Sequence, residues 1–377
     1  MIYLDYSATT PINNEVLDTY VNVSKKYIGN PNSLHKLGVE SKNIIDMATT
    51  QIKNILKVKN HEVIYTSGSS ESNNLALKGI ALKYKNRGNH IVTTPLEHSS
   101  IVGPLNYLSK EGFIIDIVNL TPDGLVDIKH LKTLINDDTL LVTICAVDSE
   151  IGIRQNIEEI YDIVKNYKKC FFHIDATQII GKEEMDFNNI DLISFSAHKF
   201  YGPKGIGCLL KKENIVIDSQ INGGKSTSVY RSGTPATPLI VSMSKAIRLA
   251  NENISEKYNY VKELNEIIKN KLNTYEKVHI NSTNYSIPHI INFSVVGIKP
   301  ETLLHALEES EIYISTRSAC SNANSKSTSV YAVTKNNELA SYSVRVSLSY
   351  LTTKEEVNIF LEKFDECYKK LLLKEDV

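Results

Sequence analysis

The sequence predicts an α/β protein in which a large domain, built on a mainly parallel seven-stranded sheet, is joined to a smaller α+β domain. Between about residues 60 and 210, short apolar β-branched runs alternate with stretches of helical periodicity, which is typical of βαβ units. After about residue 250 the pattern changes to a long polar helix, a strand, and a helix that begins at Pro300. The 377 residues suffice for two or three domains of ordinary size.

Seven apolar runs account for the predicted strands of the large sheet. Each is strand-length, and together they are rich in the residues that strands favour. The strands are expected at residues 63–66, 91–93, 113–118, 140–147, 170–174, 192–195 and 206–210. Since these strands are separated by helical segments, most of them are expected to run parallel.

The helices are predicted from spacing and from their first residues. Ile157, Ile160 and Val164 lie on one face of a crossover helix, and Asn156 with Glu159 predicts a capping box at its start. The last helix is expected to follow Thr353 in the same way. In residues 343–349 apolar and polar residues alternate, which predicts a strand with Arg345 on its outward, polar face.

The overall composition excludes several classes of protein. The 42 Lys and Arg residues balance the 43 Asp and Glu residues, so no charge excess predicts binding to nucleic acid or to a membrane surface. No apolar run approaches the ~18 residues of a membrane-spanning helix, and no secretory signal is recognised, so a cytoplasmic location is expected. The five cysteines are widely spaced without any CxxC pair, which predicts neither disulfides nor a metal site.

Three polar segments stand at the predicted ends of strands, where open α/β sheets bind ligands. The first is the hydroxyl-rich turn at residues 66–71, where free N–H groups of a helix start can bind a phosphate. Simple N-capping by Ser69 or Ser70 is the alternative, and it is favoured when this turn is considered alone.

The other two segments carry an acid and an amine. Asp175 ends an apolar strand, where a carboxylate can keep a heteroaromatic nitrogen protonated, although such residues are more often turn formers. Lys199 lies in a turn between two buried strands, where loss of water lowers the pKa of a lysine and makes it a nucleophile, although most lysines are solvated. A phosphate site, an acid and an amine together fit one cofactor, pyridoxal phosphate.

The sequence resembles the cysteine desulfurases of the class V aminotransferase family, in the form with a long catalytic loop. The resemblance extends over nearly the whole chain and implies the type I fold of pyridoxal-phosphate enzymes. We expect a large domain at residues 12–255 and a small domain that combines residues 1–11 with 256–377. The matching segments are residues 2–11, 29–31, 66–71, 97–98, 150–152, 175–178, 196–205, 231–234 and 318–320.

The resemblance implies a role for each matching polar residue. Lys199 would form the Schiff base, Asp175 would pair with the pyridinium nitrogen, and His98 would stack on the ring and move protons. Arg345 would bind the substrate carboxylate, with Asn30 also at the substrate. The remaining cofactor contacts are expected from Gln178 and Ser149 at the ring oxygen, and from Ser69, Ser70, Ser196, His198 and, in the neighbouring subunit, Thr234 at the phosphate.

Cys320 would be the nucleophile of the implied reaction. Its thiolate would attack the sulfur of bound L-cysteine, leaving an enzyme persulfide and releasing L-alanine, and the sulfur would pass to an acceptor protein. Thr234 implies a homodimer with shared sites. Arg317 is a candidate to lower the pKa of this thiol, whereas the other four cysteines lie in predicted strands or the last helix and are expected to be structural.

Several residues depart from the pattern of the family. Asp148-Ser149 stands where two asparagines are usual, and the shorter Ser149 is a doubtful partner for the ring oxygen. Residues 225–228, Arg317 and residues 349–350 also differ. Two alternatives to a cysteine desulfurase therefore stay open: a pyridoxal-phosphate lyase for another substrate such as selenocysteine, and a non-catalytic sulfur-carrier scaffold.

Overall fold

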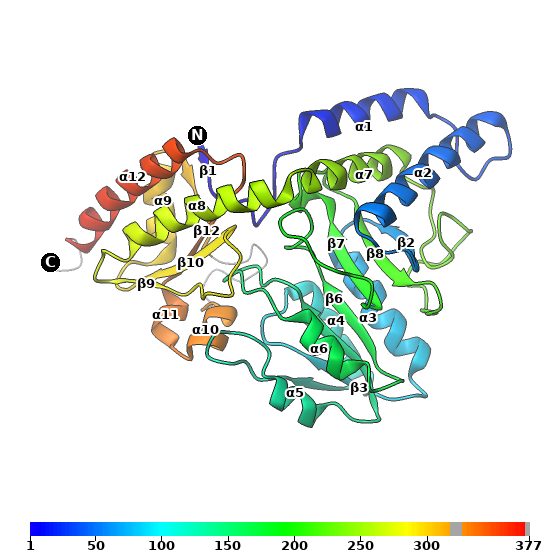
Figure 1. Cartoon of the computed structure of the whole chain (residues 1–377), viewed down its shortest axis with the longest axis horizontal. Helices are drawn as coiled ribbons and strands as arrows, with labels where there is room; N and C mark the ends of the chain where they lie inside the picture. The colour runs from blue at the N-terminus through cyan, green and yellow to red at the C-terminus, as the bar shows by residue number, and fades with distance from the viewer. Residues whose placement is uncertain (317–325, 374–377) are drawn as a thin grey trace.

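The structure is a computed structural model that describes residues 1–316 and 326–373. A seven-stranded sheet lies at the centre of the larger part of the molecule (Figure 1). All seven predicted strands are confirmed, with ends that shift by no more than two residues. In spatial order they are β2 (His61–Thr66), β8 (Gly207–Lys212), β7 (Leu192–Ser196), β6 (Phe171–Asp175), β5 (Thr139–Cys145), β3 (His90–Thr93) and β4 (Ile114–Ile117).

The sheet is mainly parallel, as predicted. The pairs β7–β6, β6–β5, β5–β3 and β3–β4 are parallel, whereas β8 runs antiparallel to both of its neighbours, β2 and β7. Strand β2 therefore points in the same direction as β7. The segments that follow β2, β3, β5, β6 and β7 consequently meet at one edge of the sheet, which is where ligands bind in this class of fold.

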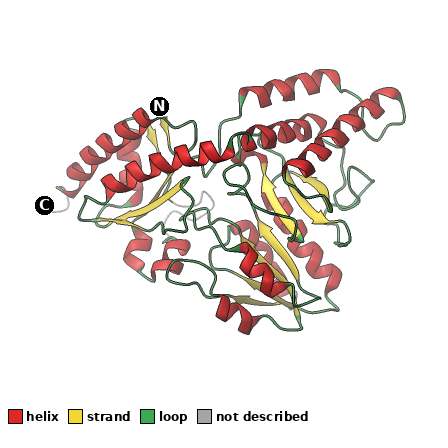
Figure 2. Ribbon diagram, in the orientation of Figure 1, coloured by secondary structure: helices red, strands yellow, loops and turns green. Residues whose placement is uncertain are grey.

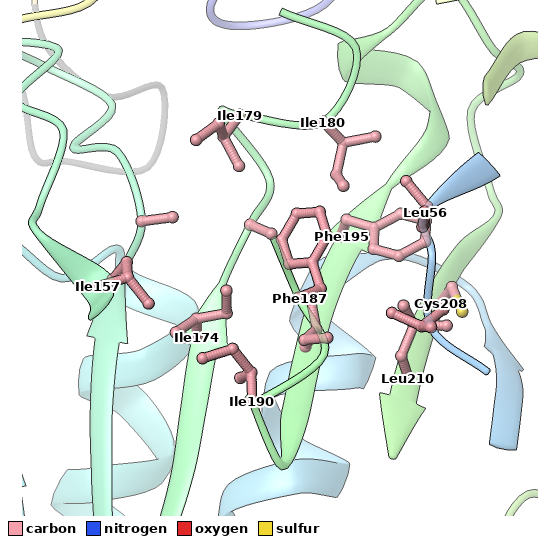
Figure 3. Packing of buried hydrophobic residues seen from close by; sticks show 14 of the residues in the cluster. Leu56, Ile157, Ile174, Ile179, Ile180, Phe187, Ile190, Phe195, Cys208 and Leu210 are labelled. Atoms are coloured by element: carbon pink, nitrogen blue, oxygen red, sulfur yellow. The ribbon is translucent and has the colours of Figure 1, made fainter. Parts of the chain in front are cut away.

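Helices cover both faces of the large sheet. Helices α3 (Ser69–Tyr84) and α4 (Ser99–Lys110) pack on one face, and α2 (Lys36–Ile55), α6 (Ile157–Val164) and α7 (Thr237–Asn251) contribute to the core on the other. Neighbouring residues of a strand alternate between the two cores. Figure 3 shows the second core, where Phe195 of β7 lies near Leu56 and Ile174 of the adjacent strand β6 lies near Ile190.

Two predictions about helix starts are wrong although both helices exist. Asn156 makes no side-chain capping bond to α6, and its Nδ2 donates to Glu159 Oε2 (3.0 Å). Helix α3 begins at Ser69 and has Gly68 at its cap position, without a side-chain cap bond. Ser69 and Ser70 therefore lie inside the helix, and neither caps it.

A second group of elements surrounds a three-stranded antiparallel sheet with the order β12-β10-β9 (Figure 2). One apolar cluster joins these elements to Ile2 and Leu4 at the N-terminus. The predicted small domain and its boundary at residue 255 stay predictions. The elements are β9 (Val278–Ile280), β10 (Ile290–Val295), β12 (Ser343–Ser347), α8 (Ile254–Leu272), α9 (Pro300–Glu308) and α12 (Lys354–Leu372).

The remaining described elements are short or peripheral. The capping box at Thr353 and Glu356, at the start of α12, is confirmed. Across the described ranges, no helix has the length and the apolar character that crossing a membrane requires. The other elements are β1 (Ile2–Tyr3), β11 (Ile312–Tyr313), α1 (Asn14–Lys26), α5 (Ile128–Leu134), α10 (Thr328–Thr334), α11 (Asn337–Ser341) and the 3₁₀ helix η1 (Ala197–Lys199).

The outward orientation predicted for Arg345 is wrong. All five residues of β12 are buried, and Arg345 is 1% exposed. The polar face of the strand is covered because the N-terminal segment pairs with it: Asp5 forms a β-bridge with Ser347. Arg345 therefore points into the interior, whereas the alternation of apolar and polar residues normally predicts that the polar face contacts solvent.

Candidate active site

A cavity of about 240 Å³ opens at the edge of the large sheet where the parallel strands end. It brings together side chains that follow five different strands of that sheet and one side chain from β12. Nine of the predicted site residues line it: Ser69, Ser70, His98, Ser149, Asp175, Gln178, His198, Lys199 and Arg345. Residues of its wall that the sequence did not single out are Ser7, Ala8, Leu96, Cys145, Val147 and Thr177.

Lys199 ends the short helix η1 between β7 and β8. Its Nζ donates hydrogen bonds to the backbone carbonyls of Ser7 (2.6 Å) and Ala8 (2.8 Å). The amine is thereby held at the cavity by a segment almost two hundred residues away in the sequence. Only the match of residues 2–11 to the family indicated that this segment belongs to the site.

Asp175 is the last residue of β6 and is buried. Its Oδ2 accepts a hydrogen bond from the Asn73 amide (2.8 Å), and its Oδ1 accepts one from the backbone N–H of Thr177 (3.0 Å). Asn73 is a site residue that the sequence analysis missed, because it lies in the interior of α3 without any motif. These two donors fix the direction of the carboxylate.

His98 is joined to Asp175 through a chain of hydrogen bonds. It caps α4 by accepting from the Ser100 N–H (3.1 Å), its Nδ1 lies 2.8 Å from Ser100 Oγ, and that hydroxyl also accepts from Asn73 (2.9 Å). Burial lowers the pKa of His98, and the nearby Lys199 adds to this effect. A neutral imidazole can accept a proton, which suits the predicted shuttle role.

The predicted phosphate site lies at the start of α3. Because Gly68 offers no side chain, the first N–H groups of this helix lack side-chain caps. Ser196 Oγ lies nearby, 3.6 Å from the place where a Cβ of Gly68 would be, although Ser196 is not among the cavity-lining residues. Burial, followed by the charge of Lys199, lowers the pKa of His198 to about 4, so this imidazole is neutral at pH 7.

Arg345 reaches the cavity from β12. One guanidinium nitrogen donates to the Ser149 carbonyl (2.8 Å), and another donates to Asp5 Oδ1 (2.8 Å). Its Nε is buried and has no hydrogen-bond partner among the described residues. The planar group is thus held in place while part of its donor capacity is unused, which fits the recognition of a carboxylate.

The substituted pair Asp148-Ser149 follows β5. Among the described contacts Ser149 acts through its carbonyl, which accepts from Arg345 and from Ser7 Oγ (3.2 Å). Asp148 is buried, and its carboxylate accepts from the N–H groups of Glu150 and Ile151 and from Ser329 Oγ (3.0 Å). Burial and the charge of Glu150 raise the pKa of Asp148 to about 6.

Two predicted site residues in the described part of the chain, Asn30 and Thr234, are not brought together with the others. Asn30 is exposed and accepts from the N–H of Asn32, and Thr234 is exposed; neither lines the cavity. Cys320 and Arg317 lie outside the described residues. The described part of the structure therefore assembles the predicted cofactor site but leaves the predicted nucleophile untested.

The donor set of the cavity fits pyridoxal phosphate. A primary amine, a hydrogen-bonded carboxylate and an uncapped helix start surround one space, and these are the groups that the cofactor's aldehyde, ring nitrogen and phosphate require. Thr177 Oγ1 and Arg345 Nε are buried at the wall without a partner among the described residues.

Comparison with known proteins relates this site to one family. The family model of class-V aminotransferases matches residues 2–360. The chain is 38% identical over 379 residues to cysteine desulfurase IscS of Buchnera aphidicola subsp. Baizongia pistaciae, which covers 98% of this chain and 93% of that protein.

Solved structures show the same relation. A NifS-like protein superposes with a TM-score of 0.91 at 33% identity, covering 97% of this chain and 98% of its own. A structure of SspA in complex with cysteine superposes with a TM-score of 0.82 at 30% identity, covering 94% of this chain and 100% of its own.

Proposed function

The chain belongs to the class-V aminotransferase family, and we propose that it is a pyridoxal-phosphate-dependent cysteine desulfurase. It removes the sulfur of L-cysteine, releases L-alanine, and holds the sulfur as a persulfide on Cys320. The observation that carries this proposal is the meeting of Lys199, Asp175 and Arg345 around one cavity of about 240 Å³. An amine, an acid and a carboxylate-binding group in one space are what an amino-acid substrate and this cofactor need.

The residues of the cavity divide the work of holding the cofactor. Lys199 would supply the amine for its aldehyde, Asp175 would pair with its ring nitrogen, and the start of α3, with Ser196 and His198, would hold its phosphate. When bound, pyridoxal phosphate withdraws electrons from the α-carbon of the amino acid. The hydrogen bonds from Asn73 and Thr177 keep the Asp175 carboxylate pointed at this position.

Arg345 and His98 act on the substrate. Arg345 binds the substrate carboxylate through its guanidinium and orients the amino acid, while Asp5 and the Ser149 carbonyl hold that group in place. His98 is neutral at pH 7 because burial lowers its pKa, so it can accept a proton near the ring.

A homodimer with shared sites is part of the proposal. Thr234 is exposed and lies outside the cavity of its own chain, which is consistent with a role in the site of a second copy. Large apolar side chains in and before α2 are exposed: Leu34 is 97%, Ile28 74% and Met47 67% accessible. Such side chains are typical of an interface between subunits, and light scattering of the purified protein tests the dimer.

The acceptor of the sulfur is a protein of iron-sulfur cluster assembly or of tRNA or cofactor thiolation. Passing a persulfide requires contact between two proteins, so the acceptor binds transiently beside the segment that carries Cys320. A cytoplasmic location stays a prediction from the sequence.

Alanine formation from L-cysteine by the purified, cofactor-loaded protein, with a thiol reductant present to discharge the persulfide, tests the function. We expect catalytic alanine formation, and we expect Cys320→Ala to abolish it while cofactor absorption stays unchanged. Cys367→Ala is the matched control, because Cys367 lies on α12 at the far side of the small-sheet core.

Three outcomes contradict parts of this proposal. Sulfur transfer by Cys320→Ala rules out Cys320 as the nucleophile. A protein that binds the cofactor but turns over L-selenocysteine and not L-cysteine is the lyase for another substrate, and a protein without any turnover is the scaffold.

A further inference from the structure

Lys182 is a buried lysine beside the cavity to which the proposed reaction assigns no role. It follows β6 by seven residues and is 8% exposed. Among the described residues no carboxylate lies within ion-pair distance of it. Its Nζ instead donates a hydrogen bond of 2.6 Å to Gln178 Oε1, which is shorter than the usual 2.9–3.0 Å for N–H donors.

The turn that follows Asp175 brings the side chains of Gln178 and Lys182 together. Ile179 and Ile180, between Gln178 and Lys182, are buried in the core of the large sheet (Figure 3). Gly181 has φ +72°, and a Cβ there would lie 2.6 Å from the Cβ of Ala250. Glycine therefore allows the chain to reverse within a packed core and to direct Lys182 back toward Gln178.

Gln178 is held at both ends of its carboxamide. Its Nε2 donates to the Ser7 carbonyl (2.9 Å), and this carbonyl also accepts from Lys199 (2.6 Å). Because the Ser7 carbonyl accepts from both Gln178 and Lys199, it alone fixes the orientation of the Gln178 carboxamide less firmly than an unshared carbonyl would. The bond from Lys182 to Oε1 is what prevents the amide from turning over, since an amide that turns would place its NH₂ group against the Lys182 amine.

We propose that Lys182 is a positioning residue that fixes the Gln178 carboxamide with its N–H donor toward the cavity, where the cofactor's ring oxygen is expected. The inference rests on the proposed function, because it assumes that pyridoxal phosphate occupies the cavity. A donor at the ring oxygen stabilises its anionic form and so lowers the pH at which the bound cofactor loses its proton.

The surroundings of Lys182 disfavour its charged form relative to a lysine in water. Burial lowers the pKa of Lys182 well below its ordinary value, and Lys199 and Arg345 lower it further. The other titratable groups that interact with it are His198 and His289, and burial also lowers the pKa of each.

The test is a pH titration of the visible absorption of the bound cofactor. We expect Lys182→Met to move the midpoint upward by about one pH unit, because one hydrogen bond to the ring oxygen is weakened. Lys182→Gln, which retains an N–H donor, should stay close to the wild type. In a Gln178→Leu background, Lys182→Met should cause no further shift, because the two residues act as a unit.

Lys211→Met is the matched control for the loss of a buried lysine. Lys211 is fully buried on β8 and donates to the Ile215 carbonyl (2.6 Å), away from the cavity. It should lower the melting temperature without moving the midpoint. If Lys182→Met does not fold, Lys182→Leu is titrated in its place with the same expectation.

The outcomes separate this inference from the proposed function. Suppose that the wild type binds the cofactor and its absorption changes with pH. The role of Lys182 alone is then overturned if Lys182→Met leaves the midpoint of that pH titration unshifted, or if Lys211→Met shifts it equally. A wild type that does not bind the cofactor overturns the proposed function and this inference with it.

Discussion

The two sheets contribute to the cavity in different ways. The seven-stranded sheet delivers Asp175, Lys199 and His98 from segments at the ends of three of its parallel strands, β6, β7 and β3. The three-stranded sheet delivers one side chain, Arg345, from the middle of a fully buried strand. That side chain is held by Asp5 and Ser149, which lie 340 and 196 residues away in the sequence.

The different origins of these side chains separate cofactor binding from substrate recognition. Residues at the ends of parallel strands are placed by the sheet itself, so the cofactor site forms wherever the large sheet folds. The Arg345 site forms only when the small sheet, the N-terminal segment and the loop after β5 meet. Cofactor binding and substrate recognition are therefore expected to respond to different mutations.

The largest effect is expected at the large-sheet edge. Lys199→Ala removes the amine, so turnover of L-cysteine should fall by about 10³-fold or more, and the visible absorption of the bound cofactor should change. Lys204→Ala, an exposed lysine in the same turn, is the control and should retain activity. Normal turnover by Lys199→Ala would exclude the assigned role.

Arg345→Met tests the small-sheet contribution. Loss of a charge-assisted hydrogen bond to the substrate carboxylate should lower kcat/KM about 10- to 100-fold, mainly through KM. Cofactor affinity should stay unchanged, since Lys199 and Asp175 are intact. A loss of cofactor binding that equals the loss in kcat/KM would show that the two sheets do not act separately.

Asp148→Asn tests the loop that joins the two regions. The pKa of Asp148 is raised from 3.8 to about 6, so the folded protein binds this proton more tightly than the unfolded chain does. The stability that this group contributes is present below about pH 4 and is lost as the pH rises to about 6. Asparagine does not ionise, so it should exceed the wild type in free energy of unfolding by up to about 3 kcal/mol at pH 7.5.

Urea denaturation at pH 4.5 and pH 7.5 measures this effect. The advantage of Asp148→Asn should shrink at the lower pH, because the wild-type carboxyl is then largely protonated in the folded state. An asparagine side chain can still accept from Glu150 and Ile151 and donate to Ser329, so the loop is kept. An equal difference at both pH values would contradict the prediction.

The smallest effect is expected at Glu97, beside His98. Burial raises the pKa of Glu97 to about 8, although its Oε1 accepts from Thr94 Oγ1 (2.7 Å) and the Cys145 N–H (2.8 Å). The carboxyl is therefore protonated at pH 7, and Glu97→Gln should leave kcat/KM at pH 7 unchanged. A marked loss of activity would show that an ionised carboxylate is needed there.

Local pattern predicted most of the large sheet and of its site. The seven strands, the crossover helix and the capping box at Thr353 follow from apolar runs and spacing, which reflect nearby residues. Strand-end Asp175 and Lys199 were found for the same reason. Asn73 was missed because its role depends on which strand α3 packs against.

The errors share a physical cause. The alternating pattern of residues 343–349 predicts an outward Arg345 because it shows which face of the strand is polar. It does not show which other segment covers that face. Asn156 was expected to cap a helix, but its amide bonds to Glu159. In both cases a contact that the pattern does not encode decided the orientation.

The sequence by itself determined the order of the strands and helices, the chemical groups at the strand ends and the membership of the family. Those properties depend on neighbouring residues and on ordered motifs. Only the tertiary structure decided that Ser7 shares its carbonyl between Lys199 and Gln178, that Asp5 holds Arg345, and that Lys182 lies behind Gln178. These contacts join segments that meet only after the core has packed, because burial and not sequence proximity brings their polar groups together.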